Sequence, residues 1–157
     1  MRPSMHTLAR ERDTAEILRR LKHVRPDSVR RWGRMSPHQM VCHLIDSWYM
    51  AIGEKPVSDA SGTLPRAFTK CVALYVPLRW PTGLVTRPEI DQEVAGTRPA
   101  EFAADLETLG ALVERFTAPG CPVPWATAHP VFGRMSARAW LRWAYLHMDH
   151  HLRQFGA

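Results

Sequence analysis

The sequence predicts an all-α protein, a four-helix bundle with a long crossover connection and an extra short helix. Apolar residues recur at steps of three and four in five separate segments, which is the spacing of one face of a helix. No segment shows the sustained alternation of apolar and polar residues that is typical of a β-strand. A chain of 157 residues can bury one sizeable core, so we expect a single domain over residues 1–157.

The first two helices are predicted from their end signals. Asp13 and Glu16 have the spacing of a capping box, and the apolar stripe that follows them ends before Pro26. Ser36 is a suitable N-cap for the second helix, a proline follows at its first helical position, and Gly53 marks its end.

Three further helices follow. The short segment 64–76 is apolar on most sides and ends before a proline, so it is the predicted extra helix. The fourth helix begins after Thr97 and carries apolar residues at helical spacing as far as Phe116. The last helix runs from Ser136 to Phe155. The connections 54–62, 77–96 and 119–130 are rich in proline or glycine and are predicted to be loops.

The composition is that of an ordinary soluble protein, with 45% hydrophobic and 23% charged residues. No apolar run approaches the roughly 20 residues of a membrane span, and no secretory signal is visible, so we expect a cytoplasmic protein without a membrane partner. Three widely spaced cysteines without a C-x-x-C motif predict reduced, structural thiols. The sequence leaves open whether the chain forms a homodimer.

The net charge of +6 arises entirely within residues 1–34. Such a basic segment could attract nucleic acid or an anionic ligand. It lacks a recognisable nucleic-acid module, so we interpret it as a solvated basic helix face and expect no nucleic-acid partner.

Two histidines of the last helix, His147 and His151, lie four residues apart and therefore project from the same face. They belong to an apolar stripe, and His43 lies in the corresponding stripe of the second helix. Three inward imidazoles could hold one divalent metal and leave coordination positions open. A buried core histidine is the alternative for each of them, and His150 competes with His151 as the second member of the pair.

A short internal repeat supports this placement. The segment GRMS occurs at 33–36 and again at 133–136, directly before the two histidine-bearing helices. Counted from the two serines, His43, His147 and His151 follow at steps of four, so they share one angular sector.

Residues 36–44 (SPHQMVCHL) and 147–155 (HMDHHLRQF) resemble the DinB-like superfamily of metal-dependent enzymes, and the likeness runs from about residue 31 to the end. A second stretch, 129–133 (HPVFG), resembles an uncharacterised bacterial branch of it. The resemblance implies a bundle of DinB-like type in which His43, His147 and His151 bind a divalent metal, nickel or zinc. The long, Pro-rich segment 54–96 departs from the pattern of many members, so the substrate pocket is the least transferable part.

The resemblance also implies metal-assisted chemistry on a small-molecule substrate, either transfer that uses a low-molecular-weight thiol or hydrolysis. The basic segment 1–34 could recruit such a thiol if it is anionic. Met148 stands where a zincin protease has its glutamate, which excludes that class. The candidate catalytic residues are His129 and Asp149, and Asp46 is a further candidate for proton transfer. His129 could equally anchor its loop. The two aspartates could instead orient a ligand histidine. The alternative functions are a non-catalytic metal- or ligand-binding stress-response bundle and, ranked last, a DNA-associated protein.

Overall fold

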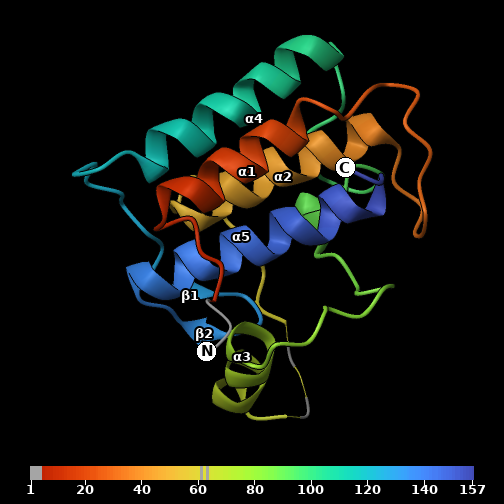
Figure 1. The fold of residues 1–157 in the computed structure, drawn as a ribbon. Coiled ribbons are helices and arrows are strands. Elements are labelled where there is room, and N and C mark those ends of the chain that lie inside the picture. The colour runs from red at the N-terminus through yellow and green to blue at the C-terminus, as the bar shows by residue number, and fades with distance from the viewer. Residues whose placement is uncertain (1–4, 61, 63) are drawn as a thin grey trace.

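The computed structural model describes residues 5–60, 62 and 64–157. Within them, four long helices form a bundle: α1 (Glu11–Leu21), α2 (Pro37–Ala51), α4 (Phe102–Thr117) and α5 (Ala137–Gln154). Helices α1 and α2 each contact both α4 and α5, so the four enclose one core (Figure 1). The short helix α3 (Arg66–Tyr75) lies outside the bundle against α5. The predicted all-α fold is therefore confirmed.

The segments between the helices contain three small elements that the sequence did not predict. The strands β1 (Ala128–His129) and β2 (Gly133–Arg134) pair antiparallel, with His129 opposite Gly133. Two residues per strand are too few to produce a visible alternation. A single turn of 3-10 helix, η1 (Pro88–Ile90), contacts α2. It lies in the long connection between α3 and α4, residues 76–101, which we call the crossover connection.

The ends of α2 and α5 follow the sequence closely. The Ser36 hydroxyl accepts a hydrogen bond from the backbone N–H of Gln39, and the Gln39 side chain accepts one from the backbone of Ser36. The Ser136 hydroxyl accepts from the backbone of Ala139 in the same way. Both GRMS segments thus form the same local structure, a glycine with positive φ followed by a serine cap.

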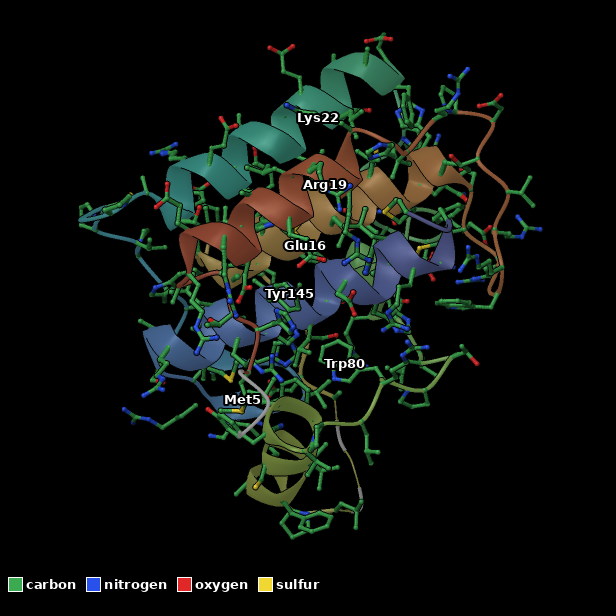
Figure 2. The ribbon with its side chains drawn as sticks, in the orientation of Figure 1. Met5, Glu16, Arg19, Lys22, Trp80 and Tyr145 are labelled. Atoms are coloured by element: carbon green, nitrogen blue, oxygen red, sulfur yellow. The ribbon has the colours of Figure 1, made fainter. Side chains whose placement is uncertain are left out.

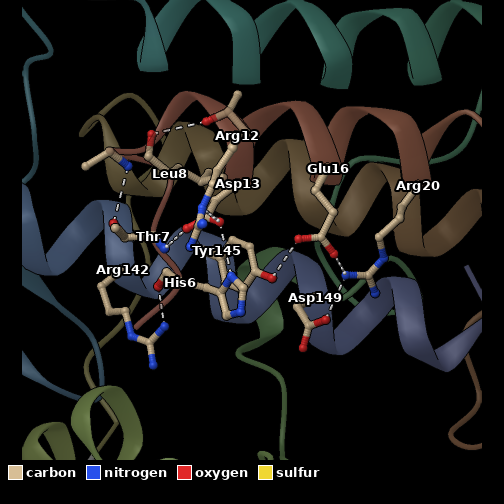
Figure 3. Close-up of polar contacts among 12 residues, drawn as sticks. His6, Thr7, Leu8, Arg12, Asp13, Glu16, Arg20, Arg142, Tyr145 and Asp149 are labelled. Carbon is tan, nitrogen blue, oxygen red and sulfur yellow. Dashed lines mark hydrogen bonds and ion pairs between the residues drawn. The ribbon is translucent and has the colours of Figure 1, made fainter. Parts of the chain in front are cut away.

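The predicted start of α1 was wrong. The helix begins at Glu11, so Asp13 lies inside its first turn instead of capping it. The Asp13 carboxylate is buried and accepts hydrogen bonds from the backbone N–H of Thr7 and from His6 (Figure 3). This carboxylate therefore fastens the preceding segment to the bundle. The fourth helix also begins later than predicted, at Phe102 rather than directly after Thr97.

The core is formed by the facing stripes of the four bundle helices. Its fully buried side chains include Ile17, Met40, Leu109 and Trp140, one from each bundle helix. Burying a side chain of this size contributes about 1.5–3 kcal/mol, so the core supplies most of the stabilisation of the bundle. None of the described helices has the length and apolar character that a membrane crossing requires.

A polar contact joins α2 and α4 beside this core. His38 and Cys42 lie one turn apart on α2, and both hydrogen-bond the Asp105 carboxylate of α4. Burial, with the nearby Asp105 charge, raises the pKa of the Cys42 thiol to about 12. Cys42 is therefore an unreactive structural thiol, and within the described residues all three cysteines are free, as expected.

Helix α3 differs from the bundle helices because most of its large apolar side chains are exposed. Of its residues only Leu74 is buried, whereas Phe68, Val72 and Tyr75 are exposed. Three hydrogen bonds hold it in place: the Arg142 side chain donates to the Leu74 carbonyl, Lys70 donates to the Arg134 carbonyl, and the Trp80 ring donates to the Ala73 carbonyl. Its neighbour in the crossover, Trp80, lies between α3 and α5 (Figure 2).

Candidate metal centre

Helices α2 and α5 bring His43, His147 and His151 together in the interior of the bundle. One ring nitrogen of each lies within 4.8 Å of the others, and the ring centroids are 4.8–5.1 Å apart. The Nε2 atoms of His43 and His147 are 3.1 Å apart. His151, rather than His150, is the member that joins this cluster.

Two of the three rings are oriented through the nitrogen that faces away from the cluster. His43 Nδ1 lies 2.8 Å from the Ile90 carbonyl oxygen, which can only accept, so Nδ1 carries the proton. His151 Nδ1 lies 2.9 Å from Oε1 of Gln154 and donates to it. Gln154 is held in turn, because its Nε2 donates to the Trp32 carbonyl at 2.9 Å. Both Nε2 atoms therefore keep a lone pair for a ligand bond.

The electrostatics keep all three imidazoles neutral. Burial lowers the pKa of His43, and it lowers the pKa of His147 and His151 well below the usual value, with the neighbouring histidines adding to the effect. Since His43 Nε2 is an acceptor, the short contact between His43 and His147 needs a proton on His147 Nε2. A divalent cation can take the place of that proton. The donor set is three neutral nitrogens around one point, which fits zinc or nickel.

His150 lies beside the cluster in an aromatic setting. Its ring is buried, with centroid distances of 5.7 Å to Trp32 and 6.2 Å to Trp80. Its Nδ1 has no hydrogen-bond partner among the described residues.

The structure places His129 on β1, with its ring stacked on Phe132 and against Trp143. Its Nδ1 accepts backbone hydrogen bonds from Val131 at 3.1 Å and Phe132 at 3.4 Å, so the histidine anchors its own turn. Burial lowers the pKa of His129 to about 3, so the ring is neutral and its proton is on Nε2. His129 also lines the cavity next to the cluster, and its catalytic role stays a prediction.

Asp149 lies on the side of α5 that faces α1 (Figure 3). Its carboxylate accepts hydrogen bonds from Arg20 at 2.8 Å and from Arg153 at 2.9 Å, and it is not among the residues that line the cavity. Arg20 also donates to Glu16 and to the carbonyl of Ala157, so this part of the basic segment holds α1 to the end of the chain. Arg2, another basic residue of that segment, lies outside the described residues.

Asp46 contacts the crossover connection. Its buried carboxylate accepts from the Lys55 ammonium, from the Gln92 amide and from both the backbone and the hydroxyl of Thr97. These contacts fix the segment that supplies the Ile90 carbonyl to His43. Asp46 thus supports the orientation of a ligand histidine through the backbone rather than by direct contact.

Sequence reasoning missed Ile90 and Gln154. Ile90 acts through a backbone carbonyl, for which no side-chain pattern exists. Gln154 follows His151 by three residues, a spacing that puts the two side chains on neighbouring positions of one helix face. That spacing was a usable signal.

The cluster borders a cavity of about 1020 Å³. Its lining includes the three histidines, Trp32 and Trp143, together with residues of α3 and of the segment 78–87. The Trp143 ring stacks on His147 with centroids 4.9 Å apart. The histidines can therefore meet a small molecule that enters between α3 and the bundle.

Comparisons with known proteins agree with this architecture. The family model described as the DinB superfamily matches residues 4–155, nearly the whole chain. Searches of curated proteins and of solved structures found no match. The extent of the family match, together with the helical bundle, shows that the chain belongs to the DinB superfamily.

Proposed function

We propose that this protein is a metal-dependent enzyme that holds one divalent cation, zinc or nickel, with His43, His147 and His151. The observation that carries the proposal is the orientation of the rings: His43 and His151 each use Nδ1 for a hydrogen bond and turn Nε2 into the cluster. Core histidines without a ligand need no such convergence, because the one donor and the one acceptor of a neutral ring can each be satisfied by a separate neighbouring group.

The reaction we propose is thiol-dependent transfer or hydrolysis of a small molecule. A divalent cation at the cluster would supply Lewis-acid activation of a water, thiol or carbonyl group. Three neutral ligands leave its positive charge uncompensated and leave coordination positions free on the cavity side. Both properties are those of a catalytic rather than a structural site.

The protein's own residues would handle binding and protons around that centre. His129 carries its proton on Nε2 and lines the cavity, so we propose that it donates a hydrogen bond to the substrate instead of acting as a base. The Trp80 and Trp143 rings next to His147 would exclude water from the reacting group.

The test is elemental analysis of protein purified without an affinity tag or chelator. We expect about one divalent metal per chain in the wild type and in His23→Ala, whose exposed ring is remote from the cluster, and loss of metal in the double variant His43→Ala/His147→Ala. A His150→Ala variant that keeps its metal supports His151 as the ligand.

Metal content, together with a turnover assay, separates the competing functions. Absence of metal in the wild type, with no uptake of added Zn²⁺ or Ni²⁺, would refute the proposed centre. Bound metal without turnover of thiol-transfer or hydrolysis substrates would favour the non-catalytic binding bundle.

A further inference from the structure

Most of the large exposed apolar side chains among the described residues line one cavity. Single exposed apolar residues are ordinary on a protein surface, but contiguous ones mark a binding site. Six large ones line the cavity beside the histidine cluster. Two belong to α3, one lies two residues before it and three lie in the segment 78–85: Phe68, Val72, Leu64, Leu78, Leu84 and Val85. Water therefore contacts an apolar wall wherever the cavity is empty of ligand.

The candidate metal centre borders the same cavity as this apolar wall. Trp80 lies between α3 and α5 (Figure 2) and within 6.1 Å of His147, measured between ring centroids. Four charged residues line the cavity, Arg34, Arg79, Arg87 and Asp91. Arg34 and Asp91 form an ion pair, and Arg87 donates a hydrogen bond to the Ser58 hydroxyl. Most of the other lining residues are apolar, so the cavity offers mainly apolar contact away from the histidines and these charged groups.

We infer that the substrate is a small molecule with an apolar chain or ring that lies against α3 and the segment 78–85, while its polar reacting group faces the three histidines. The inference rests on the proposed function, since it assigns the reacting end to the metal centre. The volume of about 1020 Å³ is at the upper end of the range for sites that take drug-sized molecules. A small molecule fits better than a second copy of the chain, because the cavity with the apolar wall is also lined by the buried His43 and His151, which the surface of a second copy would not reach.

Straight-chain hydroxamic acids test the inference, because one end binds a divalent metal and the other is a chain of variable length. Acetohydroxamic, butanohydroxamic, hexanohydroxamic and octanohydroxamic acids are titrated calorimetrically into the zinc-loaded protein. We expect affinity to rise about twofold to fourfold for each added methylene, the upper value corresponding to about 0.8 kcal/mol for a fully buried CH₂.

The chain offers a matched pair of control residues. Val85 and Val29 are both loop valines, with exposed fractions of 92% and 82%, and of the two only Val85 lines the cavity. Val85→Ser should lower the affinity for octanohydroxamic acid several-fold and leave that for acetohydroxamic acid unchanged, whereas Val29→Ser should change neither. Phe68→Ser should give a larger loss than Val85→Ser, because its ring offers more apolar area.

The outcomes separate this inference from the proposed function. If zinc does not bind and acetohydroxamic acid gives no heat, the proposed metal centre is refuted. The apolar wall is then tested separately, by the binding of butanol, hexanol and octanol to the metal-free protein, measured by tryptophan fluorescence. The same rise of affinity with chain length is expected. If zinc binds but all four hydroxamic acids have equal affinity, the inference is overturned. It is also overturned if Phe68→Ser dissociates a dimer without changing the chain-length dependence, since a second copy would then cover the wall.

Discussion

Gly33→Ala should weaken metal binding although residue 33 contacts no metal ligand. Gly33 has a φ of +76°, and a Cβ built there would lie 2.6 Å from Nε2 of Gln154. The Gln154 side chain would have to move, and it would then lose its hydrogen bonds to His151 and to the Trp32 carbonyl. His151 would be left without the acceptor that fixes its ring.

The structure provides a control with the same backbone strain. Gly53 has a φ of +78°, and a Cβ there would meet no atom within 4 Å. Each substitution should cost about 1–2 kcal/mol for placing alanine in the left-handed region. Gly33→Ala should cost about 1–3 kcal/mol more, because it leaves buried polar groups of Gln154 and its partners unpaired.

The effect on the metal should separate the two variants further. Loss of the group that orients a ligand histidine lowers metal affinity by roughly 10-fold to 100-fold. Competition with a chromogenic zinc chelator measures this affinity, and urea unfolding of the metal-free proteins measures the free energy of unfolding. We expect weaker zinc binding in Gly33→Ala and in Gln154→Leu, and wild-type binding in Gly53→Ala. Equal zinc affinity in Gly33→Ala and Gly53→Ala would refute the role of Gln154.

Three further predictions follow from the site and its surroundings. His129 has a folded-state pKa of about 3, below its unfolded value of 6.5, so the unfolded chain binds the extra proton as the pH falls. The free energy of unfolding of the wild type should therefore fall by about 2.5 kcal/mol between pH 7 and pH 4.5, and His129→Asn should not show this loss. Equal acid dependence of the two proteins in urea unfolding would contradict this. Asp149→Asn should retain its metal and its turnover and lose about 1 kcal/mol of stability, because the carboxylate is engaged by arginines; a fall in turnover at full metal content would instead assign it a catalytic role. Iodoacetamide should modify exposed Cys71 in the native protein and spare buried Cys42, as peptide mass spectrometry would show; early labelling of Cys42 would argue against its packing and its raised pKa.

The parts of the fold that depend on local sequence were predictable. The Ser36 and Ser136 caps need only a hydroxyl and a backbone N–H three residues later, and both formed as expected. The meeting of His43 with His147 followed from helical periodicity measured from these caps, since two similarly started helices turn the same sector to the bundle axis.

The parts that depend on tertiary contacts were not predictable. Asp13 has the spacing of a cap, but its carboxylate accepts a hydrogen bond from the backbone N–H of Thr7, in the segment that precedes α1. Ile90 contributes a carbonyl oxygen from an irregular connection, and its position depends on the contacts of Asp46 with Thr97. Neither fact has a signature in spacing or composition. The cavity wall was likewise hidden, because an exposed apolar helix and a buried one have the same periodicity.

The contact between His43 and His147 joins positions 104 residues apart in the chain. A cation shared by them would act as a reversible cross-link that closes most of the chain into one loop, and such closures restrict the unfolded ensemble more as the loop grows longer. His151 and Gln154 lie in the last turns of α5, where helices fray first. Fraying of that end would open the loop and release the cation in one event. The rate at which metal leaves this protein would therefore report how often the end of its last helix unwinds.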